Sequence, residues 1–520
     1  MSPKGTGAGA ADAHGVLRSP LRLGIAGHRK LRATWVLRWR VDRGLKRIRR
    51  VIRGAGIDVH VLTALAEGAD QLVAERAVRV LGASLDVQFP MSAEHYRATF
   101  SPGPSLDKLD QLLDHAIRTR SLPDRADEDE AFRRGSEVLV RRCDILFAVW
   151  DGKLARGPGG TGDSVTLARA IRRPVLWIRS TPSAMLREPF RGDRAIGMLR
   201  DVASYNRANV RVDGSLEGRR FDASGLAGTN PVMQPFIDWI EPFFVRADQL
   251  AARYKRQFLA SGVTVYLGAA AAVFTVAIQD LYFPDLEWIV LIEFGLMVLV
   301  LVTFIASRSL RFHQRWLTCR NIAEWLRTAP FLLFLGASPR LLEPDDLVTS
   351  SFNRSWMSRK HLRDGEPAIS PTYRDIVQTW LDTQIRYYGR SERANRLMHQ
   401  TLFATSAALF LVTLVAAGIH GLAHEAARGL GENTLTLLTI ALPALGASVN
   451  GLRAQGEYLR NATRFGQIGA SLRRLSARIE TEAGLDPRFM RSLVKRAATE
   501  LSSERSDWTK AMDFHEPELS

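Results

Sequence analysis

Short apolar runs alternate with amphipathic stretches between Leu21 and Ile178. The runs have the length of buried strands, and most of the stretches between them show the spacing of a helix with one apolar face. This alternation predicts a parallel sheet covered on both faces, so we expect an α/β Rossmann-like parallel-sheet domain. The expected strands are 21–27, 58–65, 85–90, 143–151 and 174–178, and the expected helices include 33–54, 105–142 and 162–172.

The second half of the chain contains four long stretches with almost no charged residue. A bilayer core about 30 Å thick needs roughly 20 apolar residues in a helix, and these stretches approach or reach that length. They predict an all-α membrane domain with four transmembrane helices. The expected spans are 258–278, 288–306, 402–419 and 435–449.

These two patterns divide the chain of 520 residues into seven parts. The first twenty residues lack the apolar core of a secretory signal and read as a disordered tail. A stretch rich in Pro, Gly, Arg and Asp follows the α/β domain and reads as a linker. The expected parts are the tail 1–20, the α/β domain 21–180, the linker 181–231, a first two-span unit 232–330, a cytosolic connector 331–374, a second two-span unit 375–480, and a cytosolic C-terminal helix and tail 481–520.

The net charge of +17 changes this picture by orienting the spans. Arg and Lys gather on one side of all four spans, whereas the loop at 279–287 carries three acids and no base. The positive-inside bias then predicts a multi-pass protein of the inner cell membrane with both termini in the cytosol. The basic segment 33–54 leaves nucleic-acid binding open, but its apolar spacing favours a helix packed on the sheet, so we regard nucleic acid as an unlikely partner.

The two membrane units also resemble each other. ADQLAARYKRQF at 247–258 precedes the first span, and ANRLMHQTLF at 394–403 precedes the third, about 147 residues later. AEWLR at 323–327 resembles GASLR at 469–473, about 146 residues later. The near-equal offsets predict an internal repeat of a cytosolic helix, a membrane hairpin and a returning amphipathic helix.

Three loops that follow strands carry the candidate binding residues, because parallel sheets bind ligands at the carboxyl ends of their strands. The first contains a glycine with two cationic neighbours, and the second opens a helix whose N-terminus can bind an anion. Plain capping by Asp70 is an equal alternative for the second. The third is a glycine-rich loop before a helix, which suits a phosphate cradled by backbone amides. The candidates are Gly27, His28 and Arg29; Glu67, Gly68, Ala69 and Asp70; and Asp151, Gly152, Gly159, Gly160 and Thr161.

Together these motifs resemble the SLOG superfamily, the Rossmann-like fold of the LOG phosphoribohydrolases, the lysine-decarboxylase-like proteins and the DNA-processing protein A group. The resemblance covers residues 20–180 and implies binding of a nucleotide or nucleotide-derived ligand by these loops. The matching residues are Gly24-x-x-Gly27-His28-Arg29, Glu67-Gly68-Ala69-Asp70, Phe89-Pro90 with Tyr96 and Phe100, Asp144, Ala148-Val149-Trp150-Asp151-Gly152 and Gly159-Gly160-Thr161.

The catalytic part of the pattern differs from that of the LOG enzymes. Asp163 stands where they have Thr, and Thr166 stands where they have a glutamate. These differences argue against hydrolysis. The alternative function is a membrane-tethered enzyme that hydrolyses a nucleotide N-glycosidic bond, with Glu67, Asp70, Asp151 or Asp163 in place of the glutamate. The sequence identifies no catalytic residue, and we expect neither a metal nor a cofactor.

The paired spans, with WLDTQIRY at 380–387 before the third, resemble the SLATT group of two-span effector domains, which accompany SLOG domains in bacterial conflict systems. The resemblance implies a ligand-controlled membrane sensor-effector in anti-phage defence that acts as a homo-oligomer and forms a pore. Two polar residues bear on this expectation: Glu293 lies within a span, where carboxylates usually face a bundle interior or a water path, and Asn450 is a candidate for interhelical hydrogen bonding. A transporter of two parallel repeats is a third possibility, disfavoured by the scarcity of polar residues in the spans.

Overall fold

The computed structural model describes two compact units, one with the sheet and one with the long helices, and each is described by itself. The predicted tail up to residue 14 lies outside the described residues, as do most of the linker and the connector and the last 20 residues. The described residues are 15–29, 31, 33–155, 157, 159–181, 192–210, 234–334, 347–348, 350–351, 373–422, 430–481, 489–490, 492–497 and 499–500.

The sheet unit contains six parallel strands in the order β4-β3-β2-β1-β5-β6, which confirms the predicted fold class. Its central strands are almost entirely buried, as expected for strands covered on both faces. The strands are β1 (Leu21–Gly27), β2 (Val59–Thr63), β3 (Ser84–Phe89), β4 (Ala116–Ser121), β5 (Ile145–Trp150) and β6 (Val175–Arg179).

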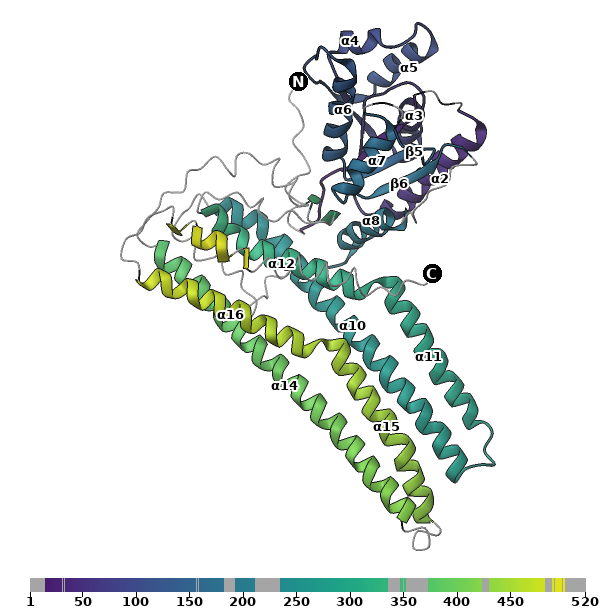
Figure 1. Cartoon of the computed structure of the whole chain (residues 1–520), viewed down its shortest axis with the longest axis vertical. Coiled ribbons are helices and arrows are strands. Elements are labelled where there is room, and N and C mark those ends of the chain that lie inside the picture. Colours follow the sequence, from purple (N-terminus) through teal and green to yellow (C-terminus); the bar gives the residue numbers. More distant parts are fainter. Residues whose placement is uncertain are drawn as a thin grey trace. The chain divides into compact units, whose positions relative to one another are not determined.

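Helices cover the sheet on two sides (Figure 1), with α2 and α3 in one layer and α6 and α7 in the other. The helices of this unit are α2 (Trp35–Ile52), α3 (Ala69–Leu81), α4 (Ala93–Ala98), α5 (Pro104–Leu113), α6 (Glu128–Arg142), α7 (Thr161–Ala170) and α8 (Gly192–Arg207).

The basic segment 33–54 forms α2 and packs on the sheet as predicted. The Thr34 hydroxyl caps its N-terminus by accepting a hydrogen bond from the backbone N–H of Leu37. Its buried residues recur every three or four positions, so one apolar stripe faces the sheet and the arginines face outward. The buried residues are Leu37, Val41, Leu45, Ile48 and Ile52.

One predicted helix of this unit is wrong. The stretch 105–142 is not helical throughout, because β4 lies within it. That strand is exposed and carries Arg118 and Arg120, as expected for the edge of a sheet, so its hydropathy gives no strand signal.

The tail and the linker also contribute to the fold. Part of the predicted linker forms α8, which packs against α2 and β6. The Asn206 amide of α8 bonds the backbone N–H and C=O of Leu17 at 3.0 and 2.8 Å. Leu17, predicted to lie in a disordered tail, is only 2% exposed. The sheet unit therefore begins at Val16, within the predicted tail, and extends to Asn209, within the predicted linker.

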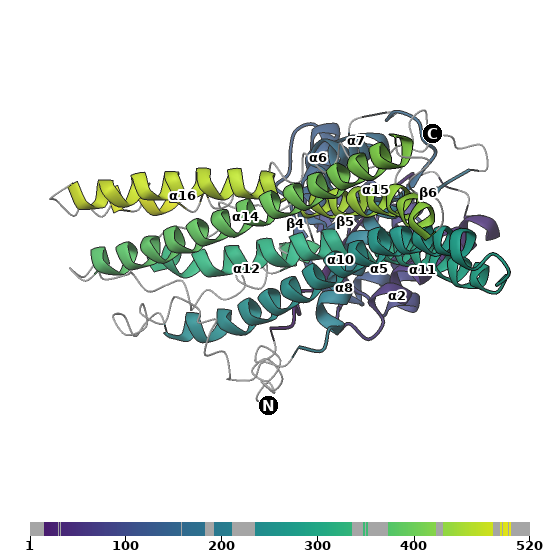
Figure 2. The ribbon, with the colours of Figure 1, turned by 90° about the horizontal axis from the view of Figure 1, so that it is seen from below.

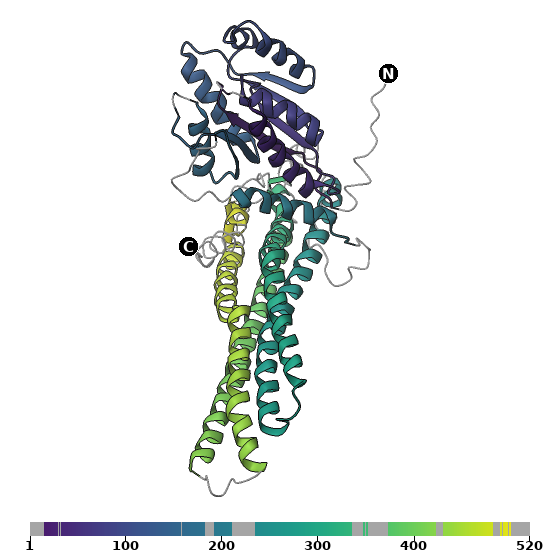
Figure 3. The same cartoon turned by 90° about the vertical axis from the view of Figure 1, so that its right-hand side faces the viewer.

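The second unit consists of long helices, four of which are long and apolar enough to cross a membrane, as predicted. Each half of this unit contains one very long helix that packs along the two helices following it (Figure 3). The helices are α10 (Gln234–Tyr282), α11 (Ile289–Leu310) and α12 (Phe312–Phe334), then α14 (Tyr373–Leu422), α15 (Leu430–Gly456) and α16 (Tyr458–Thr481).

Candidate ligand-binding site

The candidate site lies at the carboxyl edge of the sheet, where β1 and β5 are neighbours. From β1 the chain builds the sheet toward β4, and it later crosses back to add β5 and β6 on the other side. The loops after β1 and β5 therefore leave in opposite directions, which opens a crevice at this switch point in sheets of this type. The predicted loops at Gly27–Arg29 and Asp151–Thr161 follow these two strands.

The first and third loops meet through His28 and Asp151. The His28 Nε2 atom lies 3.2 Å from the Asp151 backbone N–H and 3.2 Å from its carboxylate oxygen Oδ1. The Asp151 side chain is 12% exposed and that of His28 is 28% exposed. A neutral imidazole accepts the bond from the N–H, whereas a protonated one pairs with the carboxylate. Either form ties the ends of β1 and β5 together.

The first and second loops meet through glycines. A Cβ on Gly27 would lie 2.2 Å from Ala69 Cβ, and one on Gly68 would lie 2.2 Å from the carbonyl oxygen of Arg29. Gly68 also has φ +81°, which favours glycine. The Ala69 N–H donates to the His28 carbonyl at 3.1 Å. These contacts place the N-terminus of α3 directly against the loop that carries Arg29.

Asp70 is buried rather than exposed as a simple helix cap. It is 6% exposed, and the Thr63 hydroxyl at the end of β2 donates to its carboxylate at 3.2 Å. Burial raises the pKa of Asp70 to about 7, although the Thr63 hydroxyl and the Arg29 charge act in the opposite direction. The carboxyl group therefore changes charge near neutral pH. Glu67, one turn earlier, is half-buried.

An aromatic cluster beside Arg29 was not among the predicted binding residues. The Arg29 guanidinium lies 4.2 Å from the ring centroid of Phe132 in α6. The neighbouring Tyr96 ring is fully buried and packs edge-on against Phe132 and Phe100. The Tyr96 hydroxyl is near enough to Arg29 for that charge to oppose the rise in its pKa that burial causes.

Yet this buried hydroxyl has no hydrogen-bond partner of ordinary geometry among the described residues. Buried polar atoms are rarely left unpaired, and such an atom calls for an explanation, for instance a group that is bound there. Tyr96 belongs to the motif at Phe89–Phe100, so the sequence contained a signal for it. Phe132 lies in a polar helix and had none.

The glycine-rich loop packs on α6, the helix that carries Phe132. Gly159 has φ +72°, and a Cβ there would lie 2.6 Å from the backbone N of Arg133. The Ser136 hydroxyl donates to the Gly159 carbonyl at 2.8 Å, and the Gly159 N–H donates to the Asp163 carboxylate at 3.1 Å. Asp163 therefore closes this loop. The loop leads into α7 at Gly160, whose N-terminus has no side-chain cap.

The remaining predicted residues of this loop lie between the end of β5 and the start of α7. Gly152 has φ +85° directly after Asp151, and Thr161 is 7% exposed at the start of α7. Thr166, which stands in place of the LOG glutamate, is exposed on α7. No group of three or more His, Cys, Asp or Glu side chains in the described ranges is arranged to hold a metal ion.

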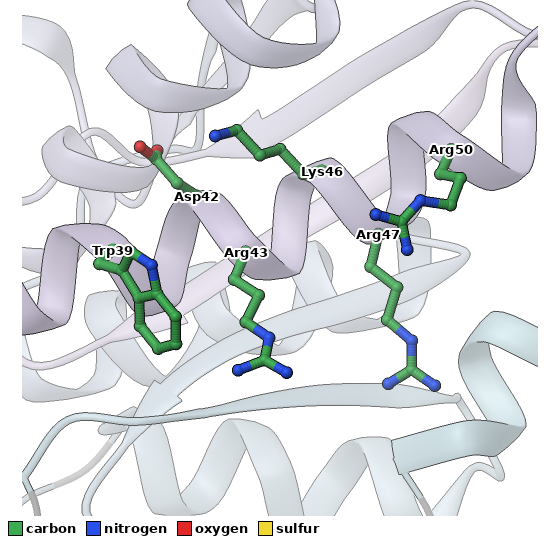
Figure 4. A pocket seen from close by; sticks show the side chains of 6 residues that line it. All are labelled: Trp39, Asp42, Arg43, Lys46, Arg47 and Arg50. Atoms are coloured by element: carbon green, nitrogen blue, oxygen red, sulfur yellow. The ribbon is translucent and has the colours of Figure 1, made fainter.

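A separate hollow of about 440 Å³ lies on the outer face of α2 (Figure 4). It is not at the carboxyl edge of the sheet and contains none of the predicted binding residues. Asp42 within it pairs with Arg76 of α3, and Trp39 is 53% exposed. The lining residues are Trp39, Asp42, Arg43, Lys46, Arg47 and Arg50.

The two polar residues of the membrane spans have different surroundings. Glu293 is half-buried on the same helical stripe as Ile289 and Val300 of α11. Asn450 is exposed on α15. Hydrogen bonds between α15 and α10 involve Ser448 and Gln455 near Asn450, and Asn433 and Thr434 at the other end of α15. The interhelical role of Asn450 stays a prediction.

The comparisons with known proteins concern the helical unit. Residues 243–339 match the family described as "Protein of unknown function (DUF4231)". No curated protein matches the chain. The matched segment contains most of α10, all of α11 and all of α12, so the family corresponds closely to the first predicted two-span unit.

Proposed function

We propose that the protein is a membrane sensor-effector, in which the sheet unit binds a nucleotide-derived ligand and thereby controls the helical unit. The observation that carries the proposal is the composition of the carboxyl edge. Two helix N-termini without side-chain caps, the Arg29 guanidinium and the unpartnered Tyr96 hydroxyl gather around a single switch point.

The chemistry of this edge suits a phosphorylated ligand. Helix N-termini carry a partial positive charge and unpaired N–H groups, and together with an arginine they favour phosphate. Carboxylates such as Glu67 and Asp70 suit the hydroxyl groups of a ribose. The motif resemblance to SLOG proteins supports the same class of ligand.

The helical unit is the proposed effector. Its four apolar helices suit a bilayer, and the distribution of basic residues favours cytosolic termini in an inner membrane. The resemblance to SLATT domains favours a pore that acts in defence against phage. Control by a ligand requires that the ligand bind two states of the protein with different affinity.

A thermal-shift screen of residues 15–232 against nucleotides, linear and cyclic oligonucleotides and ADP-ribose derivatives tests the proposal, with mass analysis of each mixture. We expect one ligand to raise the melting temperature and to be recovered intact. The Arg29→Met variant should lose most of this shift, whereas Arg38→Met, an exposed arginine of α2, should keep it. The absence of any shift across the panel, or an equal shift in both variants, would contradict the proposal.

Asp70 supports a second candidate function, hydrolysis of the N-glycosidic bond of the ligand. A buried carboxyl group with a pKa of about 7 can act as a general acid at neutral pH. Recovery of free base and sugar phosphate in the same screen would identify an enzyme. If the Asp70→Asn variant no longer released these products, the general-acid role would belong to this carboxyl group.

A further inference from the structure

The helical unit contains the same three-helix module twice. In each copy a helix of 49 or 50 residues is followed by a hairpin helix of 22 or 27 and a return helix of 23 or 24. The break between the last two falls on a non-glycine residue in the left-handed region, Arg311 with φ 54° and Glu457 with φ 48°. These breaks lie about 146 residues apart, the offset predicted for this part of the repeat.

The two modules pack against each other through α10 and α15. The Ser448 hydroxyl donates to the Tyr266 carbonyl at 2.8 Å, and the Gln455 amide donates to the Phe258 carbonyl at 3.0 Å. A Cβ on Gly262 would collide with Gln455, and one on Gly451 with Tyr266. The contact is therefore close and antiparallel. Figure 1 shows the apolar helices in the order α14, α15, α10, α11.

This contact joins unlike helices of the two modules. The first helix of module one meets the second helix of module two, whereas the reciprocal pair, α11 and α14, does not pack together over the described residues. A two-fold relation would make both contacts. The modules are therefore related by a head-to-tail step, which leaves one unused surface at each end of the row.

The two modules also touch at the other end of the bundle. Here α12 of module one lies against module two (Figure 2), with the rings of Phe331 and Trp380 4.7 Å apart and Arg320 over Phe465 at 5.4 Å. The direction of the step is therefore given by the α10–α15 contact and by the order of the apolar helices.

The unused surfaces are the outward faces of α11 and α14. Their apolar windows are 6% and 11% buried, against 22% for α10 and 17% for α15, which lie in the middle of the row. Leu301 of α11 is 57% exposed and Leu411 of α14 is 61% exposed. Ala404 and Ala408 are exposed one helical turn apart on α14, where small residues allow close approach of a second helix.

We propose that α11 of one copy packs against α14 of a second copy of this chain, repeating the α10–α15 contact between molecules. Each added copy again offers one α11 and one α14, so the contact propagates until the row closes into a ring of helices within the membrane. The orientation agrees, because α11 and α14 run in opposite directions through the bundle, as α10 and α15 do. The contact involves no ligand, so its test and the ligand screen succeed or fail independently.

Cysteine cross-linking of the full-length protein in native membranes tests this contact. The natural Cys143 and Cys319 are buried and are replaced by alanine. Leu301→Cys is then combined in turn with Leu411→Cys, Val412→Cys or Val415→Cys, exposed positions within about one turn of α14, and each variant is oxidised with copper phenanthroline. A disulfide within one chain is excluded, since it needs Cα atoms within about 7 Å and two helices lie between these positions.

We expect at least one pair to give a ladder of covalent dimers, trimers and larger species that ends at the ring size. The single-cysteine variants should remain monomeric. Tyr266→Cys with Ser448→Cys serves as the control for folding and should form a disulfide within one chain. If the control forms its disulfide and every α11–α14 pair stays monomeric, the proposal is overturned. Dimers from a single-cysteine variant, together with no species larger than a dimer from any cysteine pair, would show a two-fold contact instead. That result would also overturn the proposal.

Discussion

Replacing the buried Asp70 by asparagine should change how the stability of the sheet unit depends on pH. The folded carboxyl group keeps its proton up to about pH 7, whereas the ordinary value in an unfolded chain is 3.8. Between these values unfolding releases a proton, so the free energy of unfolding falls as pH rises. Asparagine keeps the shape of the side chain and an oxygen for the Thr63 hydroxyl, and it cannot titrate.

The size of the effect follows from the two pKa values. A change from 3.8 to about 7 corresponds to at most roughly 4 kcal/mol, at 1.36 kcal/mol per pKa unit. Asparagine has one acceptor oxygen fewer, and backbone N–H groups at Ala64 and Ala66 bond this carboxylate. The lost acceptor costs about 1 kcal/mol. At pH 8 the variant should therefore be more stable than the natural protein by about 1 to 3 kcal/mol.

Urea unfolding of residues 15–232 at pH 5, 6, 7 and 8 measures this difference. The natural protein should lose stability relative to Asp70→Asn as pH rises toward 7. Above pH 7 the difference between the two proteins should level off. Subtracting the free energies of unfolding of the two proteins at each pH cancels the contribution of other titrating groups. One such group is His60, whose pKa is lowered by burial in both proteins. Asp114→Asn, an exposed carboxylate, should follow the natural protein. Parallel curves for the natural protein and Asp70→Asn would refute the assignment of a raised pKa.

Three further predictions test the site and the topology. Gly68→Ala should destabilise the sheet unit by more than about 2 kcal/mol, because the added Cβ would meet the Arg29 carbonyl. Gly54→Ala, also at positive φ but in open space, should cost about 1 kcal/mol, and urea unfolding midpoints measure both changes. Tyr96→Phe should leave stability within about 0.5 kcal/mol, because its hydroxyl has no hydrogen-bond partner of ordinary geometry among the described residues. It should weaken a ligand from the screen about 10-fold in calorimetry, and unchanged affinity would exclude a contact with the hydroxyl. A membrane-impermeant maleimide applied to intact cells should label Asp285→Cys and not Arg256→Cys, and the reverse pattern would overturn the predicted orientation.

Hydropathy was sufficient to predict the parts of this fold that are buried on all sides or surrounded by an apolar phase. β5 is a continuous apolar run, β1 is apolar apart from Arg22, and the four long helices have windows of mean hydropathy between 1.6 and 2.8. The same signal missed β4, because an edge strand forms its hydrogen bonds through the backbone and exposes its side chains. Strand pairing of this kind leaves almost no trace in composition.

The limits of the sheet unit depend on contacts between residues far apart in the sequence. Asn206 bonds Leu17 and also the carbonyl of Ala55, which joins the start of the unit, the turn after α2 and α8. No local pattern around a single asparagine signals such a bridge. Segments rich in Gly, Pro and Arg were therefore read as tail and linker, although part of each is packed.

The site shows a similar division between what local sequence predicts and what only packing reveals. The glycines at 27, 68 and 159 were read as positions where backbone can approach a ligand, and each instead lies where a Cβ would strike a neighbouring element of the protein itself. Close packing alone would account for them. It does not account for Tyr96, whose hydroxyl is buried beside Arg29 with no hydrogen-bond partner of ordinary geometry among the described residues. For this reason the argument for a ligand depends more on one tyrosine and one arginine than on the glycine motifs that first suggested it.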